Sequence, residues 1–81
     1  MILVDVYVPS VDATYDLELD ENVEISDVID KISDMLCAYL NMERKDEKKF
    51  MLCSLSKKKI LNGHSTLSAN DIRNGDKLLL V

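Results

Sequence analysis

The chain is poor in the residues that most catalytic motifs need. Its 81 residues include no tryptophan, two glycines (Gly63 and Gly75), one histidine (His64) and two cysteines (Cys37 and Cys53). Two isolated glycines cannot form the glycine-rich loop that cradles a phosphate. A Cys–His pair would need its side chains within hydrogen-bond reach, and neither cysteine has the cationic sequence neighbours that activate a thiol. We therefore expect no enzyme activity and no cofactor.

Long hydrophobic runs are also missing. No apolar stretch approaches the roughly 18–20 residues of a membrane span. The first eight residues, MILVDVYV, carry no basic residue and meet an acid at Asp5, so we expect no signal peptide. Both cysteines lie in apolar segments, which favours reduced, packed thiols in a cytoplasmic protein, with a single disulfide as the alternative.

Charge is distributed unevenly along the chain. The net charge is −5, but residues 1–42 hold ten acidic residues against one lysine, whereas residues 43–81 hold nine basic residues against five acidic ones. The run Lys57-Lys58-Lys59 has no aromatic neighbour to stack on a base, so we interpret it as a solvated turn and expect no nucleic-acid partner. Carboxylates at positions 27, 30 and 34, or at 16, 18, 20 and 21, could gather a hard cation, but a solvated acidic surface is favoured and no metal site is predicted.

Alternating hydrophobicity predicts a β-hairpin at the start of the chain. In MILVDVYV one face would carry four apolar side chains: Ile2, Val4, Val6 and Val8. The segment TYDLEL at residues 14–19 alternates in the same way, and the turn-forming stretch PSVDA at residues 9–13 lies between the two.

From residue 25 the hydrophobic period becomes that of an α-helix. One stripe of this helix is apolar and would face the core: Ile25, Val28, Ile29, Ile32, Leu36, Tyr39 and Leu40. The helix is expected to begin near residues 24–26, with Ser26 as a candidate N-cap, and to end near Asn41. A charged connector, NMERKDEKK, follows at residues 41–49.

Three short strands complete the predicted sheet. They are FMLCSL at residues 50–55, the segment 59–61 and the segment 77–81, with a small helical turn within residues 65–72 and tight turns at Asn62-Gly63 and Asn74-Gly75. FMLCSL is apolar on both faces, so its register is ambiguous. The run LLLV is typical of a central strand with a parallel neighbour. The order predicts a single α+β domain over residues 1–81: a β-grasp with a mixed sheet of four to five strands packed on one long helix.

The order of elements resembles ubiquitin over the whole chain. Three short motifs, Tyr15-Asp16-Leu17, Val28-Ile29-Asp30 and Gly75-Asp76-Lys77-Leu78, are more specifically similar to the YukD/EsaB family of ubiquitin-like proteins. That family is associated with bacterial type VII (WXG100) secretion systems. The resemblance implies a cytoplasmic accessory or regulatory component that binds subunits of the secretion machinery. As in that family, no C-terminal glycine pair is present, so we expect no conjugation; the alternative is a sulfur carrier or protein modifier of the ubiquitin-like class.

Strand alternation also predicts where a partner binds. If the alternate valines of the first strand face the helix, the other face of the sheet is open and apolar side chains of the first and last strands meet on it. This protein-interaction patch would comprise Leu3, Tyr7, Leu79 and Val81. A second copy of the chain, forming a homodimer, is also a candidate partner.

Overall fold

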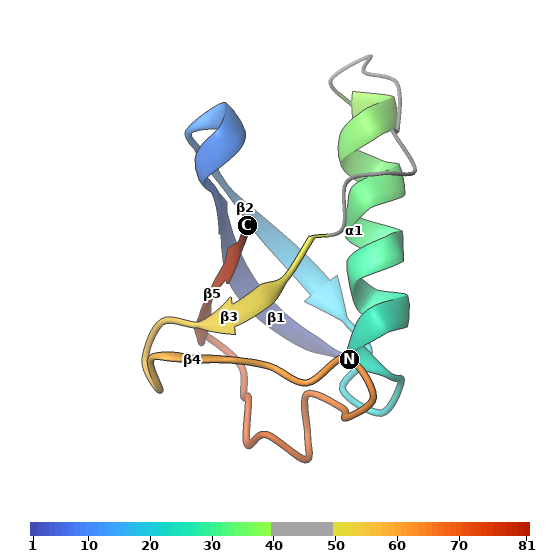
Figure 1. The fold of residues 1–81 in the computed structure, drawn as a ribbon, viewed down its shortest axis with the longest axis vertical. Helices are drawn as coiled ribbons and strands as arrows, with labels where there is room; N and C mark the ends of the chain where they lie inside the picture. Colours follow the sequence, from blue (N-terminus) through green and yellow to red (C-terminus); the bar gives the residue numbers. More distant parts are fainter. Residues whose placement is uncertain (40–49) are drawn as a thin grey trace.

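The computed structural model describes residues 1–39 and 50–81, so Leu40 and the predicted connector at 41–49 lie outside the described residues. These described residues form five strands and one α-helix (Figure 1). Their bounds are β1 Ile2–Val8, β2 Ala13–Leu19, α1 Ile25–Tyr39, β3 Leu52–Ser54, β4 Lys59–Ile60 and β5 Lys77–Leu80, with a short 3-10 helix, η1, at Pro9–Val11.

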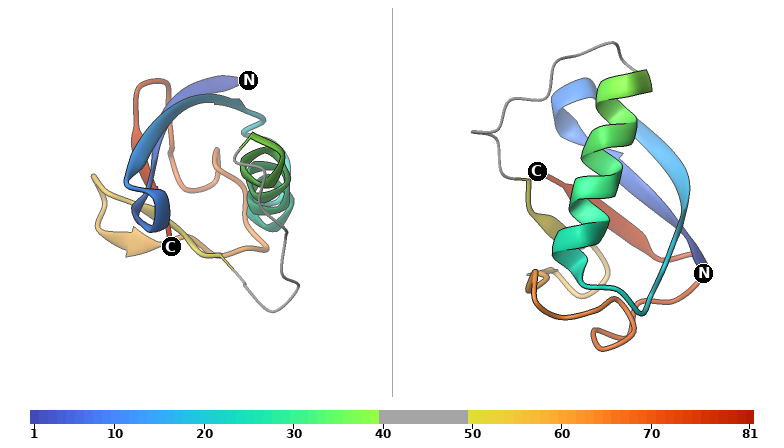
Figure 2. Two further views of the ribbon diagram at one scale, coloured as in Figure 1. Left: turned by 90° about the horizontal axis from the view of Figure 1, so that it is seen from above. Right: turned by 90° about the vertical axis from the view of Figure 1, so that its right-hand side faces the viewer.

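The five strands form one mixed sheet in the order β2-β1-β5-β3-β4. β1 pairs antiparallel with β2 and parallel with β5, and β3 pairs antiparallel with both β5 and β4. The helix α1 crosses one side of the curved sheet and leaves the opposite side open (Figure 2). The predicted β-grasp fold and the parallel, central position of the last strand are confirmed.

The hairpin of β1 and β2 follows from its residues. β-Branched side chains fill β1, and the alternation of TYDLEL places the polar side chains of β2 on the exposed side. Between the strands, Pro9 starts η1 and Asp12 ends it in the left-handed region at φ 48°, a conformation that aspartate tolerates better than most residues. The amide of Asp12 donates to the carbonyl of Pro9 at 3.1 Å, which closes the turn.

The start of α1 is held by a loop from a distant part of the sequence. The amides of Ile25 and Ser26, two of the helix's initial donors, bond to the carbonyls of Ser65 and Gly63 at 2.8 and 2.9 Å. Ser26 is therefore not the N-cap that the sequence predicted. It lies inside the first turn, and its hydroxyl contacts the Glu24 carboxylate at 3.4 Å.

The core lies between α1 and the covered face of the sheet. Its buried hydrophobic residues are Val4, Val6, Val8, Leu19, Ile25, Val28, Ile32, Leu36, Leu52, Leu61, Leu67, Ile72, Leu78 and Leu80. The predicted helical stripe is confirmed through Leu36 but is wrong at Tyr39, which is 76% exposed and only meets the ring of Tyr15 edge-on at 6.2 Å. The structure also settles the register of β3, because Leu52 and Ser54 point inward.

The approach to β5 is set by the turn at residues 73–76. Gly75 adopts φ +84°, which the predicted Asn74-Gly75 turn requires. Its amide donates to the Leu3 carbonyl at 2.8 Å, and the Asn74 side chain accepts from the Leu3 amide at 2.7 Å. These bonds align β5 with β1. The predicted helical turn is looser than expected, because residues 67–71 form consecutive turns rather than a regular helix.

Candidate protein-interaction surface

A row of side chains crosses all five strands on the open face of the sheet. Register pairs Tyr7 with both Thr14 and Leu79, Leu79 with Cys53, and Cys53 with Ile60. Adjacent positions in register lie on the same face, so these five residues form one continuous line. We call this line the central row. Its side chains are mostly apolar, and Ile60 at its end is 62% exposed.

The four residues of the predicted patch divide between different rows. Tyr7 and Leu79 are partners in register and both belong to the central row. Val81 directly follows β5 and lies one row further along. Its amide donates to the Met51 carbonyl at 2.9 Å, and its carbonyl accepts from the Met51 amide at 2.7 Å. Leu3 is separated from Tyr7 by Asp5, which points to the same face.

Sequence reasoning missed the half of the surface that β3 and β4 contribute. A hollow of about 260 Å³ lies there, lined by Cys53, Ser54, Leu55, Lys58, Lys59, Ile60 and Leu79. Leu55 and Ile60 are exposed, and Cys53 is half-buried. The apolar side chains of FMLCSL on its outward face were the available signal, but its ambiguous register hid which of them point outward.

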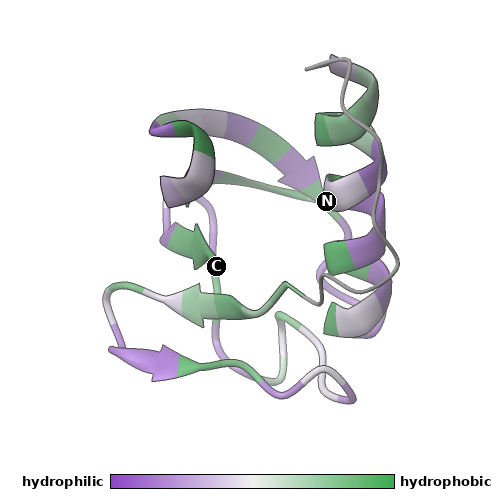
Figure 3. Cartoon of the chain, turned by 45° about the horizontal axis from the view of Figure 1, so that its top comes forward, coloured by the Kyte–Doolittle hydropathy of each residue, from purple (hydrophilic) through white to green (hydrophobic). Residues whose placement is uncertain are grey.

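The row beside the central row carries charge. Asp5 is in register with Asp16 on one side and with Lys77 on the other. The turn between β3 and β4 continues this row. It begins at Leu55, whose amide donates to the Lys77 carbonyl at 3.1 Å, and it ends at Lys58. This charged row therefore begins with two acids at β2 and β1 and ends with a lysine near β4. In hydropathy, β2 alternates along its length whereas β3 and β5 are more hydrophobic (Figure 3).

Tyr7 is oriented by the turn that follows its own strand. Its phenol donates to Asp12 Oδ1 at 2.7 Å. This hydrogen bond raises the pKa of Tyr7, since losing the proton would leave two anions in contact. The ring is thus held as a neutral phenol between Thr14 and Leu79 in the central row.

Asp5 and Asp16 face each other across the hairpin. A side-chain hydrogen bond with Asp5 and the repulsion between the two carboxylates raise the pKa of Asp16. Like charges directly opposite on a sheet destabilise it when both are ionised.

Replacing Asp16 with asparagine should therefore stabilise the protein at neutral pH. The folded state holds the Asp16 proton more tightly than the unfolded state, so stability is lost as the pH rises through the raised pKa. Asp16→Asn removes this pH-dependent loss of stability. The variant should therefore be more stable than wild type at neutral pH, and the difference in the free energy of unfolding should vanish below the ordinary pKa of aspartate. Urea titrations at pH 7 and pH 3 test this expectation, with Glu18→Gln on the same strand as the control. An advantage of equal size at both pH values would contradict it.

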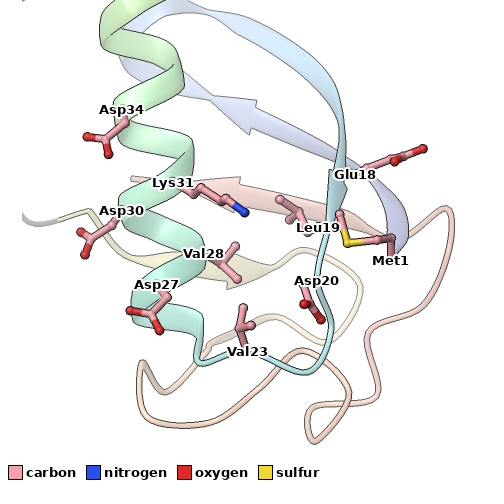
Figure 4. Close-up of a pocket in the computed structure, with 10 residues that line it drawn as sticks. All are labelled: Met1, Glu18, Leu19, Asp20, Val23, Asp27, Val28, Asp30, Lys31 and Asp34. Carbon is pink, nitrogen blue, oxygen red and sulfur yellow. The ribbon is translucent and has the colours of Figure 1, made fainter.

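A second hollow lies between α1 and β2 and has a volume of about 290 Å³. Its lining residues are Met1, Glu18, Leu19, Asp20, Val23, Asp27, Val28, Asp30, Lys31 and Asp34. Lys31 extends from α1 toward β2 across this hollow, whereas the carboxylates of Asp30 and Asp34, which also line it, point away from β2 (Figure 4). The hollow is therefore a weaker candidate than the open face, because a side chain of the protein already crosses it.

The cysteines, the histidine and the acidic residues were the other candidates for a site. Cys37 and Cys53 are both free and only half-buried, so neither thiol is fully packed as predicted. The amide of His64 bonds to the Asn62 side chain at 2.9 Å within an exposed turn. Across residues 1–39 and 50–81, no three histidine, cysteine or acidic side chains are placed to hold a metal ion. In the same residues no helix is long and apolar enough to cross a membrane.

Comparison with solved structures assigns the protein class. The ubiquitin-like domain of EccD5 from Mycobacterium xenopi superposes with a TM-score of 0.76 at 22% identity, covering 99% of this chain and 91% of that domain. A chain of the ESX-5 inner membrane complex also gives a TM-score of 0.76, at 19% identity, with 99% of this chain and 20% of the larger one covered. The N-terminal ubiquitin-like domain of the 4931431F19Rik protein gives 0.68 at 22% identity, covering 99% and 72%. The fold is a ubiquitin-like β-grasp.

Comparison of the sequence with protein families goes one step further. Residues 3–80 match the family described as WXG100 protein secretion system (Wss), protein YukD. The chain therefore belongs to the YukD family, and it is associated with type VII secretion machinery, as its short motifs predicted. Among curated protein sequences no significant match is found.

Proposed function

We propose that the protein is a non-catalytic docking module that binds a subunit of the type VII secretion machinery on its cytoplasmic side, as an accessory or regulatory component. Membership of the YukD family supports the pathway. The presence of a ubiquitin-like domain of similar fold in the ESX-5 inner membrane complex supports contact with the membrane machinery.

The observation that carries the proposal is the central row. It combines an oriented tyrosine, a central leucine and an exposed isoleucine on one uncovered sheet face. Interfaces concentrate their binding energy in such clusters of aromatic and aliphatic side chains within a polar rim. The charged row, with acids at one end and Lys58 at the other, supplies part of that rim.

The proposed mode of binding is non-covalent, because the central row offers apolar side chains that a partner can cover without any chemical step. A sulfur carrier or protein modifier of the ubiquitin-like class is the alternative.

Leu79→Asp should weaken binding to the secretion machinery. A carboxylate in the middle of the central row would have to be desolvated in the complex, so we expect a loss of about 1–3 kcal/mol, or roughly 5- to 150-fold in Kd. The measurement is biolayer interferometry of the purified type VII membrane complex from the source organism against wild type and variant.

Met35→Asp is the matched control, because Met35 is an exposed apolar residue on α1, away from the open face. It should bind as wild type does. Equal binding by Leu79→Asp and wild type would show that the partner uses another face. No binding by wild type at any concentration would refute the proposed function itself.

A further inference from the structure

We propose that the open face also binds a second copy of this chain, in a twofold-symmetric dimer whose axis runs along β5. This inference rests on the proposed use of the open face as a docking surface, and it names one occupant of that surface.

The position of β5 makes the face suited to such symmetry. β5 is the middle strand, with β1 and β2 on one side and β3 and β4 on the other. A twofold axis along β5, lying between two facing sheets, places β1 over the partner's β3 and β2 over the partner's β4. The strands of the two sheets then run in nearly the same direction, which is a common way for sheets to pack face to face.

The central row is self-complementary under this operation. Leu79 meets its own copy on the axis, Tyr7 lies over the second copy of Cys53, and Thr14 lies over the second copy of Ile60. Each contact is between apolar or weakly polar groups, and the contact of Tyr7 with a sulfur atom is favourable. The isologous interface therefore buries the exposed end of the row, Ile60, at both sides of the dimer.

The charges of the charged row favour a twofold axis in the same position. The operation places Asp16 over the second copy of Lys58 and Asp5 over the second copy of Leu55. An axis across the strands would instead place the acidic β2 over its own copy. Lys77 lies close to the β5 axis, where Asp5 of its own chain is in register with it and offsets the repulsion between the two lysines.

The area of the sheet limits the strength of this dimer. Five strands that are two to seven residues long and spaced about 4.8 Å apart give a face of roughly 400 Å². A stable interface buries about 800 Å² on each partner. We therefore expect a reversible dimer with Kd of about 10–500 μM, so that the open face is available to another partner at low concentration.

A charge-exchange experiment tests both the dimer and its axis. The dimer contains two Asp16–Lys58 contacts. Asp16→Lys alone makes both contacts repulsive, and so does Lys58→Glu alone, so each variant should dimerise about 5- to 30-fold more weakly than wild type. An equimolar mixture of the two variants has one reversed and one native contact, both attractive, and should dimerise about as well as wild type. Sedimentation velocity from 10 μM to 1 mM, at low salt and with a reductant present, gives these constants.

Two controls separate contact from net charge. Asp27→Lys and Lys31→Glu change the net charge by the same amounts, but both lie on α1, off the open face. Their dimer dissociation constants should therefore be closer to that of wild type. Circular dichroism confirms that each variant is folded. A wild type that stays monomeric at 1 mM overturns the proposal, and so does a mixture no more dimeric than its components.

The same samples separate this inference from the proposed function. A monomeric wild type whose binding to the membrane complex still depends on Leu79 would refute self-association alone. A dimer that behaves as described, together with unchanged membrane-complex binding by Leu79→Asp, would refute the docking role and leave the dimer standing.

Discussion

Leu80→Asp should unfold the protein at room temperature. Leu80 is 1% exposed and lies beneath α1, on the central strand of the sheet. An aspartate there would place an unpaired carboxylate in the core, and burying a charged group without a partner carries a large free-energy penalty. We expect a loss above about 4–5 kcal/mol, which is most of the stability of a small domain. Loss of the helical circular-dichroism signal at 25 °C would report it.

Leu79→Asp, one residue earlier, is the internal control for this experiment. Leu79 points to the open face and is only half-buried, so the same substitution should cost about 1 kcal/mol and leave the protein folded. Leu80→Ile changes the shape of the side chain but keeps it apolar, so this variant should also remain folded. If Leu79→Asp unfolds the protein and Leu80→Asp does not, the two faces of β5 have been exchanged.

Ile32→Ala should have the second-largest effect, a loss of about 2–5 kcal/mol in the free energy of unfolding. Ile32 is 2% exposed at the centre of the buried stripe of α1. Truncation removes buried methyl and methylene groups and leaves a cavity that the surrounding side chains fill only in part. Chemical denaturation with urea measures the change. Met35→Ala, on the exposed side of the same helix, should shift the midpoint by far less, and similar shifts for both would contradict the assigned helix phase.

The strands and helix were predictable because their residues repeat with a clear period. β1 and β2 alternate, and α1 keeps its apolar stripe through Leu36. The errors occur where a contact comes from a distant part of the chain. Ser26 has the chemistry of an N-cap, but the helix already begins at Ile25, where the amides of residues 25 and 26 bond to carbonyls of residues 65 and 63. Tyr39 continues the stripe, but the core ends before it.

The candidate surface was only partly predictable for the same reason. Alternation places Tyr7 and Leu79 on one face, and the parallel pairing of β1 with β5 places them in register. Leu3 fits the alternation equally well, but Asp5 stands between it and Tyr7 on the same face of β1, and the register pairs Leu3 with Glu18, outside the central row. Cys53 and Ile60 enter the row only through the pairing of β3 with β5 and β4, and three or two residues of strand carry too little pattern to reveal that pairing.

The parallel pair of β1 and β5 has a consequence for how the protein folds in the cell. Residues 5–7 find their partners at 77–79, nearly the whole length of the chain away. During translation, β1 and β2 can form a hairpin early, but the sheet has no middle strand until β5 has left the ribosome. The apolar face of that hairpin therefore stays exposed to solvent until β5 has been made. Contacts this distant in sequence also slow folding. The chain must therefore be made at least through residue 79 before the sheet can close, and a product truncated before β5 would keep its apolar surface exposed to chaperones and proteases.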